Sequence, residues 1–398
     1  MTIPFHKPYI TEDEISEVLD SLRSGWLTMG PKTIGFEEKF KEYIGSRYAV
    51  SMNSCTAALH LALLAIGLQE GDEVLLPTIT FTATAEVITY FRAKPVLVDV
   101  DEQTFNIDVV RMAQKITGKT RAFIPVHFAG QPCDMDEICR LAADHNLPVI
   151  EDAAHAIPAL YKDRKIGTIG DLTCFSFYAT KSLTTGEGGM VTTENSDWAE
   201  RMKILRLHGI SKDAWKRYTG EGSWYYEVAE AGYKYNMTDL QAALGVAQLR
   251  KLDWMWARRK AIADQYTESF RSFDEVHPPF VKAGRESAWH LYVIKLNLDA
   301  LTIDRNRFIE ELRNIGTMVS VHFIPLYRHP YYRNTFHYRT QDFPVSERIY
   351  DQLISLPIYP GMSDEDVAQV IESVRFVTRK FRRATQQAGG SSLRAAAV

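Results

Sequence analysis

The sequence predicts an α/β protein, with a large domain built on a mostly parallel sheet flanked by helices and a smaller α+β domain after it. Three observations predict this class. Short apolar runs alternate with helical patterns from residue 48 to about residue 195, as in successive βαβ units. Strands and helices alternate again over 286–375. A chain of 398 residues exceeds what one hydrophobic core normally holds.

These patterns divide the chain into three parts. We assign 1–250 to an N-terminal arm and the large domain, 251–383 to the small domain, and 384–398 to a disordered tail of low complexity. The first helix begins at Thr11, which forms a capping box with Glu14, and ends at Gly25. A second helix is expected over 34–44.

The large domain contains the alternating elements. Strands are expected at 48–52, 73–76, 95–100, 122–126, 148–151 and 172–177, and helices at 56–66, 82–91 and 134–145. Residues 197–260 have a helical pattern interrupted by an aromatic and glycine-rich loop at 218–226. Ligands of such sheets gather at the carboxyl ends of the strands.

Composition excludes several classes of protein. The net charge of −4 and pI near 6.3 argue against a nucleic-acid-binding protein. The four cysteines form no CxxC pair, which favours reduced thiols. No signal peptide precedes the first helix, and the longest apolar run, at 57–68, is too short to span a membrane. We therefore expect a cytoplasmic protein without a membrane partner.

Polar residues follow two of the predicted strands. Residues 53–57 (NSCTA) join a strand to a helix start, where free N–H groups favour a phosphate; an ordinary helix cap is the alternative. Asp152 follows Glu151 at the end of an apolar strand. A buried carboxylate needs a partner, which a protonated pyridine nitrogen or a structural cation would supply.

A lysine and an aromatic residue extend this pattern. Lys181 follows an apolar strand and precedes a glycine-rich turn, so desolvation would lower its pKa and make it nucleophilic; a solvated strand-end lysine is the alternative. Ser176 would donate to a phosphate. Phe81 begins a helix and would stack on a planar ring or fill a core. Together these residues match the needs of pyridoxal 5′-phosphate (PLP).

Seven motifs make the chain resemble the DegT/DnrJ/StrS family of sugar aminotransferases from about Pro8 to about Pro360. They are GWLTMGP (25–31), NSCTAALHLAL (53–63), PTITFTATA (77–85), EDAAHA (151–156), FSFYATKSLTTGEGG (175–189), GYKYNMTDLQAALG (232–245) and SVHFIPLYRHPYY (320–332). The resemblance implies the PLP-dependent transferase fold type I, with a seven-stranded, mostly parallel sheet in the large domain.

The resemblance also implies residue roles. Lys181 would bind the cofactor as a Schiff base and act as the catalytic base, with Asp152 on the pyridine nitrogen and His155 near the ring oxygen. Phe81 would stack on the ring, and the phosphate would meet Ser176, Cys55 and Thr56. Family members are homodimers, and Lys234 or Asn236 would reach the partner's phosphate. The substrate wall would contain Trp26, Thr28, Met29, Glu187 and His322.

The implied reaction is a two-step transamination. L-glutamate would donate an amino group to a nucleotide-linked keto-sugar, most often at C4 of a 4-keto-6-deoxyhexose, for surface glycan, lipopolysaccharide or antibiotic biosynthesis. Cations over 206–235, namely Arg206, Lys212 and Lys234, would meet the diphosphate. Three alternatives stay open: a non-catalytic PLP-binding regulator, a sugar dehydratase, which would have histidine in place of Lys181, and an enzyme acting on small amino acids. No metal is expected.

Overall fold

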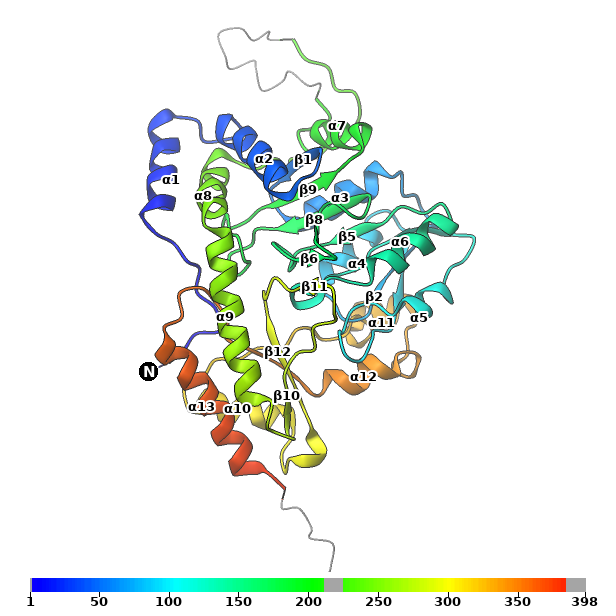
Figure 1. The fold of residues 1–398 in the computed structure, drawn as a ribbon. Coiled ribbons are helices and arrows are strands. Elements are labelled where there is room, and N and C mark those ends of the chain that lie inside the picture. Colours follow the sequence, from blue (N-terminus) through cyan, green and yellow to red (C-terminus); the bar gives the residue numbers. More distant parts are fainter. Residues whose placement is uncertain (1, 211–224, 384–398) are drawn as a thin grey trace, which may run out of the picture.

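A computed structural model describes residues 2–210 and 225–383. Its main layer is a seven-stranded sheet in the order β1-β9-β8-β5-β4-β2-β3, joined between β4 and β5 by parallel bridges (Figure 1). The strands are β1 (Tyr48–Met52), β2 (Glu73–Pro77), β3 (Lys94–Val98), β4 (Thr120–Phe123), β5 (Ile150–Asp152), β8 (Leu172–Ser176) and β9 (Gly189–Thr193). Only β9 of these strands runs antiparallel to its neighbours, so the predicted class is confirmed.

Helices cover both faces of this sheet. One face packs on α3 (Cys55–Ala65), α4 (Thr82–Thr89) and α7 (Ser196–Leu205); the other packs on α2 (Pro31–Ile44), α5 (Val109–Ala113), α6 (Met135–Asp144) and α8 (Asp239–Arg250). Strand side chains alternate between the two cores: in β2, Val74 and Leu76 face one core and Leu75 faces the other. Burial on both faces explains the nearly continuous apolar runs of the sequence.

A second sheet forms the lower part of the molecule in Figure 1. It contains β10 (Val276–His277), β12 (Tyr292–Leu296) and β13 (Leu353–Leu356), and its core includes α9 (Leu252–Phe270), α10 (Arg305–Asn314) and α13 (Asp364–Phe381). Leu252 packs with the large sheet, whereas Ile262 packs with the small one. Because α9 serves both cores, the division at 250/251 stays a prediction.

Smaller elements connect these layers. They are the strands β6 (Leu160–Tyr161), β7 (Arg164–Lys165) and β11 (Arg285–Glu286), and the helices α11 (Pro330–Phe336) and α12 (Pro344–Tyr350). β6 pairs with both β7 and β11. The β6–β11 pairing ties the large-sheet part of the chain to the segment that precedes β12.

The N-terminal arm spans both parts of the molecule. Ile3 is buried in the core of the small sheet, and its N–H donates to the Gly316 carbonyl at 2.8 Å. The arm then leads to α1 (Glu12–Ser24), which packs on α8. The Thr11 N–H donates to the Glu14 carboxylate at 2.7 Å, and Gly25 ends the helix at φ 80°, as predicted.

The helical prediction over 197–260 is wrong in its middle. Helix α7 ends at Leu205, and the described residues 206–210 and 225–238 are not helical before α8 begins at Asp239. Between them, Leu207 pairs with Lys234 and Ile210 with Val228 as antiparallel bridges, and the chain turns at His208 and Gly209. A Cβ on Gly232 would lie 2.1 Å from the Gly209 nitrogen, so the approach needs glycine. Residues 218–224 of the predicted loop and the tail 384–398 lie outside the described residues.

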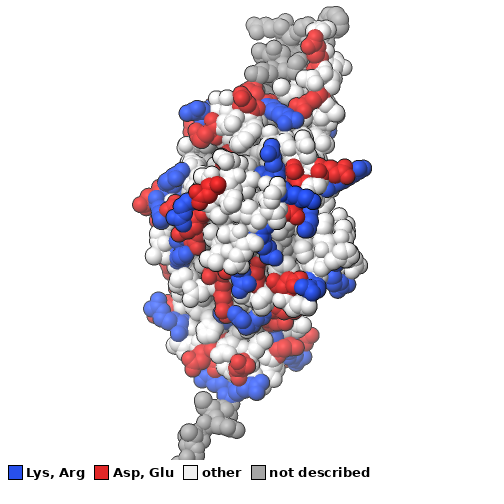
Figure 2. Space-filling view, turned by 90° about the vertical axis from the view of Figure 1, so that its right-hand side faces the viewer, with Lys and Arg blue, Asp and Glu red and all other residues white. Residues whose placement is uncertain are grey.

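The surface shows no field of one sign on the face drawn in Figure 2, where basic and acidic side chains intermingle. No helix among residues 2–210 and 225–383 is long and apolar enough to cross a membrane. The cysteines are free thiols, as predicted. In the same residues, no group of three metal-binding side chains gathers.

Candidate active site

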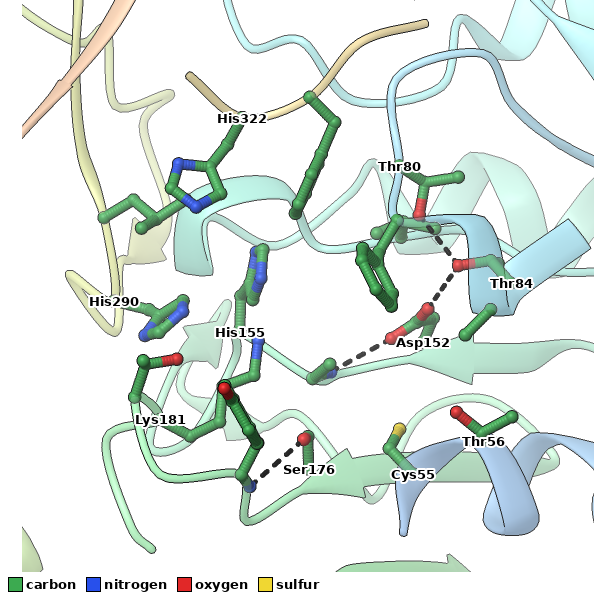
Figure 3. A pocket seen from close by; sticks show the side chains of 18 of the residues that line it. Cys55, Thr56, Thr80, Thr84, Asp152, His155, Ser176, Lys181, His290 and His322 are labelled. Atoms are coloured by element: carbon green, nitrogen blue, oxygen red, sulfur yellow. Dashed lines mark hydrogen bonds between the residues drawn. The ribbon is translucent and has the colours of Figure 1, made fainter. Parts of the chain in front are cut away.

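A cavity of about 650 Å³ opens where β1, β2, β5 and β8 end. Figure 3 shows two sides to it: Asp152, Thr84, Thr56 and Cys55 on one, and His155, His290 and His322 on the other. These positions follow from the parallel strands, whose carboxyl ends meet at one edge of the sheet. The cavity therefore brings together most of the predicted site residues. Those that line it are Cys55, Thr56, Phe81, Asp152, His155, Ser176, Lys181, Glu187 and His322.

Two adjacent acids of β5 point to opposite faces of the sheet. Glu151 is fully buried away from the cavity, 2.7 Å from His127 Nε2. The Cys133 N–H donates to His127 Nδ1, so Nε2 carries the proton that Glu151 accepts. Asp152 instead lines the cavity with 5% exposure. The strand alternation thus leaves one carboxylate for structure and one for a ligand.

Asp152 is a buried carboxylate held by two donors. Thr84 Oγ1 donates to Oδ2 at 2.7 Å, and the Ala154 N–H donates to Oδ1 at 3.1 Å. Burial nevertheless raises the pKa of this carboxyl above its ordinary value, although both hydrogen bonds lower it. A cationic ring N–H placed against Asp152 would stabilise the ionised form, so the site fits a protonated pyridine.

Lys181 lies in the loop after β8 and lines the same cavity. The surrounding protein desolvates its ammonium and lowers the pKa to about 8, while the charge of Asp152 acts in the opposite direction. Figure 3 shows Lys181 on the same side of the cavity as His155. A lysine with this pKa has a usable fraction of neutral amine near pH 7, which a carbonyl-binding nucleophile requires.

The start of α3 and the end of β8 form a polar corner beneath Asp152. Ser54 caps α3 by accepting from the Ala57 N–H at 3.1 Å. Thr56 lies in the first turn, and Ser176 ends β8 nearby. A Cβ on Gly189 would meet the Ser54 carbonyl oxygen at 2.4 Å, so glycine lets β9 pack against this turn. Helix N–H groups and hydroxyls are suited to a phosphate.

Phe81 directly precedes α4, and 59% of its surface is exposed beside the cavity. A large exposed aromatic ring at a cavity rim is available to stack on a planar ligand. Its ring lies 6.0 Å from that of Phe323. The structure thus excludes the alternative that Phe81 is a core residue.

Five predicted residues do not line the cavity of this chain. Trp26, Thr28 and Met29 lie between α1 and α2, where the Asp239 carboxylate accepts from the N–H groups of Gly30 and Thr33. Lys234 is exposed, whereas Asn236 is buried and donates to the Met237 carbonyl at 3.2 Å. Their predicted roles involve a second subunit or the substrate, and they stay predictions.

The prediction that Arg206 meets a diphosphate does not fit its position. Arg206 is 2% exposed and forms an ion pair with the buried Glu37. It also donates to the Ser51 carbonyl at 2.8 Å. A guanidinium engaged in this way holds α2, β1 and the segment after α7 together. Lys212, the neighbouring candidate, lies outside the described residues.

Several cavity residues were not predicted from the sequence. They are Phe5, His6, Thr80, Thr84, Tyr178, His290 and Phe323. Thr84 lies inside the PTITFTATA motif in the first turn of α4, and Thr80 precedes that helix four positions earlier, so this threonine-rich motif was a usable signal. His6 and His290 carry no local signal, because only the tertiary fold brings the arm and the start of β12 to this cavity.

The sheet order, the cavity lysine with its lowered pKa and the buried carboxylate of Asp152 define a PLP-dependent enzyme of fold type I. A model of the DegT/DnrJ/EryC1/StrS aminotransferase family matches residues 8–375, and the chain belongs to this family. It is therefore a transaminase.

Known proteins agree with this assignment. SpsC, a spore coat polysaccharide biosynthesis protein of Bacillus subtilis, is 50% identical over 380 residues, covering 95% of this chain and 97% of SpsC. Spr1654 of Streptococcus pneumoniae, described as a candidate sugar aminotransferase, has solved structures in its pyridoxamine phosphate (PMP) and PLP forms. The PMP form is 37% identical to this chain, with a TM-score of 0.90. The match covers 95% of this chain and 99% of Spr1654.

A third protein is less similar in sequence but equally similar in fold. Helicobacter pylori PseC, an aminotransferase involved in pseudoaminic acid biosynthesis, is 28% identical. Its TM-score is 0.89, with 96% of this chain and 100% of PseC covered.

Proposed function

We propose that this chain transfers an amino group from L-glutamate to a nucleotide-linked keto-sugar, at C4 of a 4-keto-6-deoxyhexose, for the biosynthesis of an amino-sugar. The observation that carries the proposal is the placement of Lys181 and Asp152 on one cavity with a phosphate corner and an exposed Phe81. The polysaccharide role of SpsC and the sugar role of PseC support the substrate class.

The residues would divide the work as follows. Ser176 and the first turn of α3 hold the cofactor's phosphate, Phe81 covers its ring, and Asp152 keeps a proton on its pyridine nitrogen. When bound, PLP supplies an electron-accepting ring that stabilises the carbanion formed at the donor's Cα. The amine of Lys181 removes the Cα proton and delivers a proton to the cofactor's C4′ carbon. In the second half-reaction the same amine moves these protons in reverse.

Lys181 favours this function over a dehydratase, which in this family would have histidine there. A non-catalytic PLP-binding regulator would also need a lysine for the Schiff base, so the reaction with L-glutamate separates that alternative from the proposed enzyme.

The test compares the wild type with a Lys181→Ala variant loaded with PLP. The wild type should show the visible band of lysine-bound PLP, lose it with L-glutamate, and regain it with one of UDP-, dTDP- or GDP-4-keto-6-deoxyhexose. Lys181→Ala should show neither change. Lys165→Ala is the matched control, because Lys165 also has a lowered pKa but does not line the cavity. A wild-type band that ignores glutamate and every keto-sugar would refute the proposal.

We also propose a homodimer in which Lys234 meets the partner's phosphate, because Lys234 is exposed while Asn236 is buried against its own backbone. Trp26, Thr28 and Met29 would then line the partner's cavity. Mixing Lys181→Ala and Lys234→Ala subunits tests this arrangement. A contact between subunits rebuilds one intact site in each hybrid dimer and restores activity, whereas a contact within one subunit leaves every hybrid site defective.

A further inference from the structure

Three buried ring nitrogens around the cavity lack hydrogen-bond partners within the described chain. They are His6 Nε2, His155 Nδ1 and His290 Nδ1. Leaving a buried polar atom unpaired is costly, so such atoms are uncommon in folded proteins and are often explained by a bound partner. His155 and His290 are at least nine-tenths buried, with ring centroids 4.4 Å apart. Their arrangement around one cavity indicates a polar ligand on this side.

The residues expected to hold the cofactor's phosphate and pyridine nitrogen lie away from this side of the cavity. The phosphate corner and Asp152 lie on the opposite side of the cavity in Figure 3, whereas Lys181 lies on the same side as His155. His322 and His290 face the remaining space from the small-sheet side. A group that reacts at Lys181 would approach through this space.

The imidazoles of this wall are neutral near pH 7. Burial lowers the pKa of both His6 and His322 to about 4 and that of His290 well below its ordinary value. Positive charge at Lys181 and Arg259 adds to the effect on His6 and His290. A neutral imidazole offers one donor and one acceptor, as a sugar hydroxyl does. A carboxylate would find no cation on this wall apart from Lys181.

The wall is also held rigidly. His322 Nδ1 lies 2.8 Å from Ser355 Oγ on β13, which leaves its other ring nitrogen for the cavity. Phe5 stacks on His322 with ring centroids 5.5 Å apart. The pairing of Ile3 with the segment at 316–318 fixes the arm just before Phe5 and His6. Pre-organised hydrogen-bonding groups bind with little loss of side-chain entropy.

We propose that His6, His290 and His322 form the binding wall for the hydroxyl-bearing ring of the acceptor sugar, and that the N-terminal arm completes this wall. The inference rests on the proposed function and names three residues that would recognise its substrate. His6 and His290 lie outside every motif that identifies the family in this sequence.

The experiment measures the two half-reactions separately in His6→Ala, His6→Gln and the wild type. The keto-sugar that the wild type uses fastest is titrated against the PMP form, and L-glutamate against the PLP form. We expect His6→Ala to raise the keto-sugar concentration that gives half-saturation about 10-fold. The half-reaction with L-glutamate should not change. His6→Gln should recover most of the loss, since an amide also offers a donor and an acceptor. His277→Ala, on the exposed side of β10, is the control.

Binding supplies a second measurement that does not depend on turnover. Calorimetry with the matching nucleoside diphosphate, which lacks the keto-hexose ring, should give equal affinities for the wild type and His6→Ala. An equal loss in both half-reactions, a loss only with glutamate, or no loss would each overturn the inference while leaving the proposed function intact. A wild type that accepts no keto-sugar would overturn both.

Discussion

Thr84 Oγ1 donates a 2.7 Å hydrogen bond to Asp152 Oδ2, and Thr80 Oγ1 lies 2.8 Å from the same Thr84 oxygen. Because Thr84 uses its proton on the carboxylate, Thr80 donates to Thr84. This chain of hydroxyls runs along the start of α4 and orients Asp152 toward the cavity. The Ala154 N–H fixes the second carboxylate oxygen. Asp152 is therefore oriented before any ligand arrives.

The two acids of β5 should respond differently to loss of charge. Asp152→Asn should lower transamination by about 10²–10³-fold, because an amide cannot keep the pyridine nitrogen protonated. Glu151→Gln should keep near-normal rates but lower the free energy of unfolding by about 1–3 kcal/mol, since Glu151 accepts from His127, Gly170 and Thr173. Steady-state rates and urea unfolding measure the two effects. A loss of activity in Glu151→Gln with near-normal rates in Asp152→Asn would contradict the assigned roles of these two acids.

Loading of the cofactor should depend on pH through Lys181. Its pKa is about 8 and the neutral amine reacts, so the rate of PLP binding should rise as the pH increases through 8 and level off above it. An ordinary lysine would continue to gain reactivity toward about pH 10.4. Stopped-flow absorbance on apoenzyme over this range measures the profile.

A charge change at Asp152 provides the control for this profile. The negative charge of Asp152 raises the pKa of Lys181, so Asp152→Asn should move the inflection to lower pH. An inflection that stays near 8 would show that burial alone sets the value.

Much of the large sheet was predictable because its strands are buried on both faces. The strand at Tyr48–Met52 has the predicted bounds, and the residues after β5 and β8 line the cavity as expected. Strand β9 was not predicted. Its antiparallel pairing with β1 depends on contacts far apart in the sequence, which local periodicity does not encode.

The candidate site was predictable only where its polar residues lie at or just after the end of a strand. Asp152 and Ser176 end the buried strands β5 and β8, and Lys181 lies in the loop after β8, so their place at the sheet edge follows from the topology. His6 and His290 reach the cavity through the arm and the small sheet instead. No single-sequence pattern specifies how that sheet docks on the large one, and these two residues emerged only from the structure.

Gly189 should be intolerant of a side chain. Gly189→Ala would place a methyl group 2.4 Å from the Ser54 carbonyl oxygen and displace the start of α3. We expect PLP to bind at least about 10-fold more weakly and the unfolding free energy to fall by about 1–3 kcal/mol. Gly35→Ala is the control: it lies in α2 with nothing within 4 Å, and should be stabilising by about 0.5–1 kcal/mol. Equal PLP affinity in both variants would contradict this account.

Arg206 should matter for stability and not for nucleotide binding. Arg206→Ala leaves Glu37 buried without its cation and should cost about 3–5 kcal/mol of unfolding free energy. Arg92→Ala, which breaks an exposed pair with Glu70, should cost less than about 1 kcal/mol. Urea unfolding compares the two variants. A large rise in KM for the nucleotide sugar with unchanged stability in Arg206→Ala would contradict this account and indicate that Arg206 binds the substrate.

The N-terminal arm has a consequence for how the two sheets work together. Ile3 is fastened to the small sheet, and Thr11 is fastened near α8 through the Lys251 amine at 2.8 Å. Phe5 and His6 lie on the short span between these two anchors. The arm thus connects the two parts of the molecule. A change in the spacing of the sheets would shift His6 along the cavity wall. The position of His6 in the cavity is therefore coupled to the spacing of the two sheets through this arm.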